Sequence, residues 1–280
     1  MKFATETLTS RQNPTVKWAA SLTEGKYRRR ERAFLAEGEK LTYEALSAGL
    51  PVTHIFAVPE RVRWLTGEIL PHLSQEHLPP ATVIPVSEEV FSRISTENSP
   101  QGIVCVIKYL DFFREMDIIY KEVFIFSPGK RLLALESVRD PGNLGAVIRS
   151  AVALGTDGIV LSADCADVYH PRTVRAAMGS LFRIGITIVK DFSSFIRAAQ
   201  GAGRRVLSAE LNPRAEVLGA HPLVASDIVI IGNEGHGVSA GVSALCDRAV
   251  YIPITDKAES LNAAVAAAIF MWEQNRAGRL

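Results

Sequence analysis

Residues 227–262 read DIVIIGNEGHGVSAGVSALCDRAVYIPITDKAESLN, and this stretch decides the fold class of the chain. It opens on the β-branched run Ile228–Ile231, which predicts a buried strand. Three glycines follow within residues 232–237, and they allow a sharp turn and a close approach of the backbone to a ligand. A second predicted strand, 250–254, leads through a loop into an Ala-rich helix. Because ligands of open α/β sheets bind at the carboxyl ends of the strands, the two turns predict one small-molecule pocket.

The composition is that of a globular protein with one large domain or two smaller ones. The chain has 280 residues, of which 48% are hydrophobic and 22% charged, and its formal net charge is +1. This balance excludes a polycation, so any nucleic-acid surface must be local. Cys105, Cys165 and Cys246 lie far apart without CxxC spacing, which argues against a zinc knuckle or a disulfide framework and predicts the cytoplasm. We expect no membrane, DNA or metal partner.

The local basic surface is predicted in the first 32 residues, which carry eight Lys and Arg against three Glu. Tyr27 lies inside this cluster, and its ring could stack on a base while the cations contact phosphate. A solvated helix face explains the same pattern equally well. The candidate RNA contacts are Lys17, Lys26, Arg28, Arg29, Arg30 and Arg32.

Alternating predicted strands and helices divide the chain into two α/β domains. The front domain spans residues 1–110. Residues 111–130 mix charged and aromatic side chains and end in Ser-Pro-Gly-Lys, so they predict a linker. The second domain, 131–280, begins with a predicted strand, helix and strand joined by short connections, which is typical of a βαβ unit with a right-handed crossover.

The helix of this βαβ unit, predicted at 144–154, carries two polar candidates. Asn143 is placed at or near its N-cap. Arg149 lies about a turn and a half further along, among Ala, Val and Ile residues. An Arg on so apolar a helix needs an acidic partner or a wet cleft. A structural ion pair and a functional cleft both satisfy this requirement.

Three motifs of the second domain resemble, in the expected order, the signatures of the SpoU (TrmH-like) RNA ribose 2′-O-methyltransferases. Each motif alone is a weak signal, but together, across residues 131–275, they are highly specific. A looser resemblance, to the N-terminal substrate-binding domain of that family, rests on Asn13-Pro14 with Lys17 and on residues 34–38 and 44–46. The three motifs are DPGNLG (140–145) with IRSA (148–151), IGNEG (231–235) with Gly237, and IPI (252–254) with ESLNAA (259–264).

The resemblance implies the fold and the assembly. The expected class is α/β, with a C-terminal trefoil-knotted, SPOUT-type methyltransferase domain built on a mainly parallel sheet. The smaller front domain is expected to bind RNA and to resemble kink-turn-binding ribosomal proteins. The family also implies a homodimer through the C-terminal domain.

The implied activity is methyl transfer from S-adenosyl-L-methionine to a ribose 2′-hydroxyl, expected in 23S-type ribosomal RNA. The alternatives are a tRNA 2′-O-methyltransferase, a non-catalytic RNA-binding or ribosome-assembly protein of the same fold, and an antibiotic-resistance enzyme with the same chemistry. A dinucleotide-dependent oxidoreductase is disfavoured, because GNEGHG is not GxGxxG and lies late in the chain.

The resemblance also implies roles for single residues. Arg149 is expected at the reacting hydroxyl, either to activate it or to clamp a phosphate. Asn143 and Glu234 are expected to orient Arg149 or the ribose. Ser260 and Asn262 are expected to fix the nucleotide or the loop, although helix capping explains both equally well. The expected cofactor contacts are Glu210, Leu211, Gly232, Asn233, Ile252 and Leu261.

Overall fold

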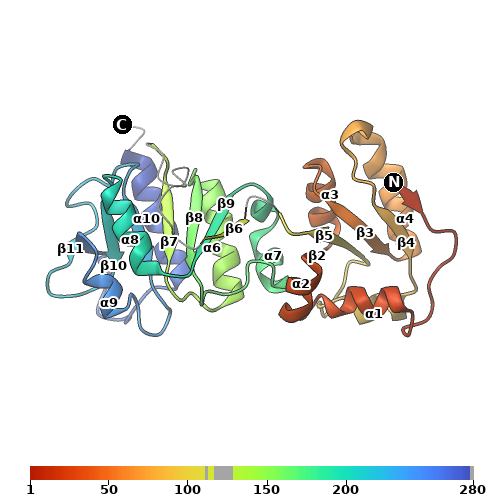
Figure 1. The fold of residues 1–280 in the computed structure, drawn as a ribbon, viewed down its shortest axis with the longest axis horizontal. Helices are drawn as coiled ribbons and strands as arrows, with labels where there is room; N and C mark the ends of the chain where they lie inside the picture. The colour runs from red at the N-terminus through yellow and green to blue at the C-terminus, as the bar shows by residue number, and fades with distance from the viewer. Residues whose placement is uncertain (111–112, 117–128, 278–280) are drawn as a thin grey trace. The chain divides into compact units, whose positions relative to one another are not determined.

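The computed structural model describes residues 1–110, 113–116 and 129–277 (Figure 1). The chain divides into two compact units. The first unit joins Met1–Asp111 with Asp167–Phe182, and the second joins Phe112–Ala166 with Arg183–Leu280. Residues 167–182 therefore pack with the first unit, although the sequence analysis placed them in the second domain. No helix among the described residues is long and apolar enough to cross a membrane.

The first unit is an α/β structure with helices on both faces of a mixed sheet. Within the described ranges the sheet has five strands in the order β1-β4-β3-β5-β2, and β5 runs antiparallel to both of its neighbours. Its strands and helices are β1 (Lys2–Phe3), α1 (Pro14–Ser21), α2 (Gly25–Glu31), β2 (Ala33–Glu37), α3 (Glu39–Ser47), β3 (Val52–Ala57), α4 (Pro59–Trp64), β4 (Thr82–Pro85), α5 (Glu88–Ile94), β5 (Ile103–Lys108) and α7 (Pro171–Ala177).

Side chains of β2 alternate between the two faces of this sheet, as strand geometry requires. Leu35 points into a core that α1 and α5 share, together with Val16 and Phe91. Phe34 points the other way, and its ring lies 4.5 Å from the ring of Tyr169. Tyr169 comes just before α7, which contacts β2 on that face. The segment 167–182 is therefore part of the first unit's packing.

The second unit is built on a parallel sheet. Among the residues that the structure describes, the sheet has eight strands in the order β11-β13-β10-β12-β7-β8-β9-β6, and every neighbouring pair is parallel. Its strands and helices are β6 (Phe113–Met116), β7 (Leu132–Leu135), α6 (Pro141–Ala153), β8 (Gly158–Ser162), β9 (Gly185–Val189), α8 (Phe192–Gly201), β10 (Val206–Ala209), β11 (Glu216–Val217), β12 (Ile228–Ile231), α9 (Ala240–Ser243), β13 (Arg248–Tyr251) and α10 (Ala263–Ala277).

Helices cover both faces of the parallel sheet (Figure 1). Phe195 and Ile196 of α8 pack with Val242 of α9 against one face, on side chains such as Ala134 and Ile230. Helices α6 and α10 contact each other, α6 also contacts β8, and α10 also contacts β12. Successive side chains along a strand point to opposite faces of the sheet. Strand residues that alternate with those packed on α8 therefore face α6 and α10.

Two expectations about local structure need correction. Helix α6 begins at Pro141, and its N-cap is Asp140, whose Oδ1 accepts from the Asn143 amide at 2.8 Å. Proline suits the first helical position, because its φ is already helical and its missing N–H would lack a partner there. Within the predicted linker, residues 113–116 form β6, which pairs with β9. Residues 111–112 and 117–128 of that linker lie outside the described residues.

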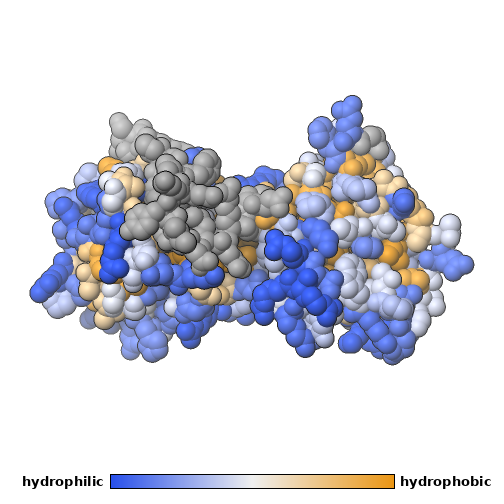
Figure 2. Space-filling model, viewed as in Figure 1, coloured by the Kyte–Doolittle hydropathy of each residue, from blue (hydrophilic) through white to orange (hydrophobic). Residues whose placement is uncertain are grey.

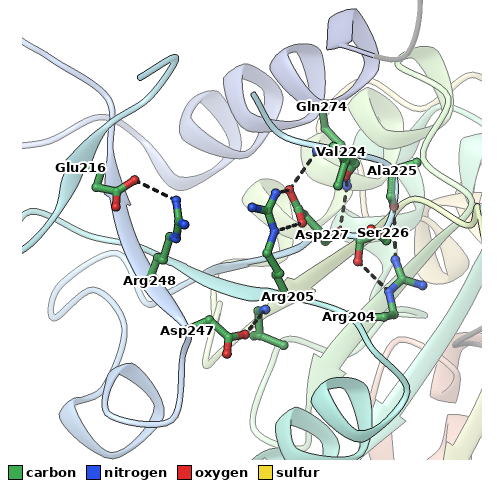
Figure 3. A network of polar contacts seen from close by, with 11 residues as sticks. Arg204, Arg205, Glu216, Val224, Ala225, Ser226, Asp227, Asp247, Arg248 and Gln274 are labelled. Atoms are coloured by element: carbon green, nitrogen blue, oxygen red, sulfur yellow. Dashed lines mark hydrogen bonds and ion pairs between the residues drawn. The ribbon is translucent and has the colours of Figure 1, made fainter. Parts of the chain in front are cut away.

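A buried carboxylate fixes the amino end of β12 (Figure 3). Asp227 is fully buried, and its two oxygens accept from Arg205 Nε at 2.8 Å and from Arg205 Nη2 at 2.7 Å. The Asp227 carbonyl accepts from Gln274 Nε2 of α10 at 2.8 Å. The bidentate pair of Arg205 with Asp227 fixes the start of β12, and the hydrogen bond from Gln274 connects α10 to it. The carboxyl end of β12 is left to form the site.

Candidate functional site

A pocket of about 520 Å³ lies in the second unit at the carboxyl ends of β10, β12 and β13. Three segments supply most of its wall: the turn after β10, the glycine-rich loop after β12, and the chain between β13 and α10. This is the edge of a parallel sheet where ligands bind. The lining residues are Ala209, Glu210, Leu211, residues 231–238, Val250, Tyr251, Ile252, Ile254, Glu259, Ser260, Leu261, Ala263, Ala266 and Phe270.

The glycine-rich loop folds back on itself without room for a side chain at its start. Asn233 and Gly237 exchange two backbone hydrogen bonds, of 3.0 and 2.9 Å. A Cβ atom built on Gly232 would lie 2.1 Å from the Gly237 carbonyl carbon and 2.2 Å from the Val238 nitrogen. Both neighbours are backbone atoms, so neither can turn aside. Only glycine therefore fits at position 232, and its backbone forms the pocket wall.

All six predicted cofactor residues line this pocket. The Glu210 carboxylate is held in place, because its Oε1 accepts from Ser208 Oγ at 2.6 Å and from Ser243 Oγ at 2.5 Å. The Asn233 side chain is engaged within the protein: Nδ2 donates to the Ser137 carbonyl at 2.7 Å, and Oδ1 accepts from the Gly235 amide at 2.9 Å. Asn233 is thus left to face the pocket through its backbone.

Three of the predicted reacting-site residues form one hydrogen-bonded chain. Asn143 Nδ2 donates to Glu234 Oε1, and Asn262 Nδ2 donates to Asn143 Oδ1, both at 2.9 Å. Asn262 also caps α10, since its Oδ1 accepts from the Ala264 amide at 2.9 Å. Glu234 and Ser260 lie in the pocket wall, which places the chain beside the pocket. Segments about 30 and 90 residues apart in sequence therefore meet at one point.

Arg149 stands apart from this chain. It lies on α6 with an exposed side chain, and that side chain makes no hydrogen bond or ion pair with any residue that the structure describes. It does not line the pocket either. The acidic partner considered from the sequence is therefore not found among the described residues. The Arg149 guanidinium reaches water from a largely apolar helix, and its place in a functional cleft stays a prediction.

Glu136 is a residue of the site that the sequence analysis did not single out. It follows β7, and its carboxylate accepts from the Ser239 amide at 2.8 Å and from Ser239 Oγ at 2.6 Å. Ser239 ends the glycine-rich loop and caps α9. Glu136 thus closes that loop against the neighbouring strand. The only sequence signal was a carboxylate directly after a buried strand, and this signal does not predict that Glu136 contacts Ser239.

The basic segment of the first unit forms an exposed cationic surface. Helix α2 carries it, and hydrophilic side chains gather over α2 in Figure 2. Lys26 and Arg30 lie over the Tyr27 ring, 4.7 and 4.9 Å from its centroid. Arg32, directly after α2, lies 5.5 Å over the Tyr109 ring. Five of the six predicted RNA contacts are exposed: Lys17, Lys26, Arg29, Arg30 and Arg32.

The sixth predicted contact, Arg28, is wrong as a phosphate ligand. Its side chain is only 2% exposed, and its Nη2 donates to Asp167 Oδ2 at 2.7 Å. Nη1 donates to the Leu22 and Thr23 carbonyls at 3.0 and 2.7 Å. The guanidinium therefore joins α2 to the segment 167–182. Sequence could not reveal this, because the acidic partner lies far along the chain.

Arg28→Ala is expected to lower the free energy of unfolding by about 3 kcal/mol, because it leaves Asp167 and two carbonyls without their donor. Urea titration of the full chain measures this loss. Arg30→Ala is the matched control, since its side chain is exposed and should change stability by less than about 0.5 kcal/mol. Equal stability of both variants and the parent would contradict the structural role of Arg28.

Burial makes the three cysteines of the chain poor nucleophiles. Burial raises the pKa of Cys105 and of Cys246 to about 12, and it also raises the pKa of Cys165. A raised pKa lowers the thiolate fraction, and the thiolate is the nucleophilic form. In the described ranges, no group of three or more His, Cys, Asp or Glu side chains could hold a metal ion.

Known proteins are similar to this chain in sequence and in structure. The chain is 31% identical to the 23S rRNA (guanosine(2553)-2′-O)-methyltransferase RlmP of Bacillus subtilis, over 94% of this chain and 96% of that protein. It is 28% identical to the 23S rRNA (uridine(2479)-2′-O)-methyltransferase of Streptomyces viridochromogenes, over 98% and 93%. The crystal structure of an AdoMet-bound rRNA methyltransferase from Sinorhizobium meliloti superimposes with a TM-score of 0.81 at 30% identity, covering 98% of both chains.

Two family models match successive parts of the chain. A MRM3-like substrate binding domain matches residues 13–105, which lie in the first unit. The SpoU rRNA Methylase family matches residues 130–272, which include the glycine-rich loop, the pocket and the chain of Asn143, Glu234 and Asn262. This protein therefore belongs to the SpoU rRNA methylase family.

Proposed function

We propose that this protein transfers a methyl group from S-adenosyl-L-methionine to a ribose 2′-hydroxyl of large-subunit ribosomal RNA. One observation carries the proposal: Glu234, Asn143 and Asn262 form a single hydrogen-bonded chain beside a nucleoside-sized pocket. The two relatives named above, whose names specify 2′-O-methylation of 23S rRNA, support the same reaction and substrate class.

The pocket fits the proposed cofactor. Its volume of about 520 Å³ lies in the range of roughly 300–1,000 Å³ that small-molecule sites occupy. Exposed apolar side chains at its rim, Leu211 at 76% and Ile254 at 40%, suit an aromatic base. The fixed Glu210 carboxylate can accept from hydroxyl groups, and the Gly232 backbone allows close approach. S-adenosylmethionine bound here would supply an electrophilic methyl group.

The residues beside the pocket then position the RNA. We propose that Arg149, an exposed guanidinium, binds the phosphate next to the target ribose. Glu234 and Asn143 hold each other in orientation, so that their remaining polar atoms contact the ribose. Asn262 fixes the start of α10 and, with Ser260, the loop that borders the pocket. Holding the hydroxyl in line with the methyl group supplies much of the acceleration. The ribose oxygen would take the methyl group, the methyl–sulfur bond would break to release a neutral thioether, and the hydroxyl proton would pass to water.

Labelled S-adenosylmethionine with purified protein and unmodified ribosomal and transfer RNA tests this function. We expect label in a 2′-O-methylated nucleoside from ribosomal RNA. Label from transfer RNA alone would move the substrate to that class. Cofactor binding without label in mature RNA calls for the same assay on ribosome-assembly intermediates. The absence of both label and cofactor binding would leave an RNA-binding protein without catalysis. Mapping the modified nucleotide distinguishes a housekeeping from a resistance role.

We also propose that the cationic surface on α2 holds RNA by its phosphates. Removing Arg29 and Arg32 together is expected to reduce the slope of log affinity against log salt by about 1.4, since each phosphate contact on single-stranded RNA contributes about 0.7. Filter binding from 50 to about 300 mM salt measures the slope. Arg63→Ala, which removes an exposed cation from α4, is the control. An unchanged slope in the double variant would place the RNA surface elsewhere.

A homodimer through α10 is a further part of the proposal. Val265, Ala268, Ile269 and Trp272 are spaced to share one face of this helix. Val265 is 48% and Trp272 55% exposed, and apolar faces of this kind mark interfaces. Because the chain resembles the SpoU family, we expect a second copy of the chain to cover this face of α10. Sedimentation velocity is expected to give a dimer at micromolar concentration, and a monomer would contradict the proposal.

The trefoil knot and the likeness of the front unit to kink-turn-binding proteins also remain proposals. The strand order supports the knot, because β13 pairs with β10 and not with β12, which precedes it in the chain. The tight loop at Gly232 lies between these strands. A crystal structure that traces residues 227–262 tests the threading, and binding to kink-turn RNA against a straight duplex tests the likeness.

A further inference from the structure

Ser137 has a strained backbone in the loop between β7 and α6. Its φ is 55°, and it is one of three non-glycine residues with positive φ in the part of the chain that the structure describes. Such a conformation costs roughly 1–2 kcal/mol in a residue with a Cβ atom, so the surroundings must impose it. The residue lies between β7 and the Asp140 cap of α6.

Three side chains from other segments hold Ser137. Its amide donates to Ser162 Oγ at 2.8 Å, and its own Oγ donates to Asp164 Oδ2 at 2.6 Å. Its carbonyl accepts from Asn233 Nδ2 at 2.7 Å. Every polar group of Ser137 is therefore bonded, and each bond comes from a different side chain. Several hydrogen bonds to one residue, each from a different segment, can keep its backbone in a strained conformation.

Asp164 is the centre of this arrangement. Besides Ser137 Oγ, its carboxylate accepts from Ser162 Oγ at 2.6 Å and from Arg139 Nη2 at 3.1 Å. Burial by itself would raise the pKa of Asp164, but the hydrogen bonds from Ser137, Ser162 and Arg139 outweigh it and lower the pKa to about 2. The carboxylate is thus ionised, and able to accept all three bonds, at any pH at which RNA is stable.

The held turn connects the two halves of the reacting site. Toward α6, Ser137 is followed by Asp140, which caps the helix and places Asn143 in its first turn. Toward β12, Ser137 is bonded to Asn233, the neighbour of Glu234. Asn143 and Glu234 then meet at 2.9 Å. The turn at Ser137 therefore sets the distance between the two loops that carry this pair.

We propose that Asp164 and Ser137 are positioning residues for methyl transfer, which hold the β7–α6 loop so that Asn143 meets Glu234. This inference rests on the proposed function. Neither residue lines the pocket. Loss of the Asp164 carboxylate is therefore expected to lower kcat and to leave cofactor affinity nearly unchanged, whereas a glycine at position 137 can keep the turn without it. A purely structural role would instead lower stability without this separation.

Asp164→Asn tests the proposal, because it keeps the shape, removes the charge and replaces one of the two acceptor oxygens with an NH2 donor. We expect kcat to fall by about 100-fold, the usual effect of a small misplacement, with the Kd for S-adenosylmethionine within about 3-fold of the parent. Ser137→Gly adopts the same φ without strain and should retain most activity. In the Asp164→Asn background, Ser137→Gly should restore kcat to within about 5-fold of the parent.

The control is Asp157→Asn, at the amino ends of β7 and β8, where the carboxylate accepts from Lys130 Nζ and the Arg131 amide. It should leave kcat unchanged. Full kcat in folded Asp164→Asn, or no rescue by Ser137→Gly, would overturn the proposal. If Asp164→Asn does not fold, Ser162→Ala replaces it with the same expected loss.

Amide hydrogen exchange separates this proposal from the proposed function, because it needs no turnover. Exchange at residues 137–143 should rise in Asp164→Asn and return in the double variant. A parent protein without methyl transfer but with this exchange pattern would refute the function and keep the positioning role. Unchanged exchange in Asp164→Asn would refute the positioning role itself.

Discussion

Arg149→Ala is expected to lower methyl transfer by about 1,000-fold, within the range that loss of one reacting-site group produces. The structure explains why the loss should be confined to catalysis. The Arg149 side chain is exposed and unpaired within the described residues, so its removal should change stability by less than about 0.5 kcal/mol. It is not a pocket residue, so the Kd for S-adenosylmethionine should stay within a few-fold.

Single-turnover methyl transfer with saturating cofactor, together with calorimetric titration of the cofactor, measures both quantities. Arg197→Ala is the matched control, since Arg197 is an exposed arginine on α8. It should leave transfer unchanged. Arg149→Lys separates a bidentate phosphate contact from a simple charge, because ammonium cannot reproduce the planar fork. A fully active Arg149→Ala would remove this residue from the reacting site.

Gly232→Ala is expected to weaken cofactor binding by about 100-fold or more, which corresponds to about 3 kcal/mol. The added methyl group would lie 2.1 Å from the backbone of Gly237 and 2.2 Å from that of Val238. The loop must therefore open, and the bonds between Asn233 and Gly237 must break. The same strain should lower the free energy of unfolding.

Calorimetric titration and urea unfolding measure the two effects of Gly232→Ala. Gly241→Ala is the control, because a Cβ atom there would meet nothing within 4 Å. It should bind the cofactor like the parent. Parent-like affinity in Gly232→Ala would mean that the loop has another conformation in solution.

Strong local patterns were sufficient to predict much of this fold. The β-branched run Ile228–Ile231 forms β12 as predicted. Predictions from sequence were wrong where the local pattern is weak or where contacts between distant residues determine the structure. Strand β6 has the sequence Phe-Arg-Glu-Met, which carries no strand periodicity, and only its pairing with β9 defines it.

The candidate site shows the same division. Motif positions led to the pocket and to Asn143, Glu234 and Asn262, which the fold brings into one hydrogen-bonded chain. The burial of Arg28 could not be predicted, because a charge cluster in sequence says nothing of a partner 139 positions away. The Ser137–Asp164 contact was equally hidden, since neither residue type nor spacing predicts a left-handed turn there.

The place of residues 167–182 in the first unit has a consequence for the order in which the protein can be made. A ribosome releases residues 1–111 long before Asp167, so the emerging front unit at first has neither the acid that pairs with Arg28 nor the ring that covers Phe34. Completion of that unit must wait until the strand β8 and the segment beyond it have been synthesised. The first unit is therefore not one continuous segment, and a gene fusion that ends at residue 111 would lack part of its packing.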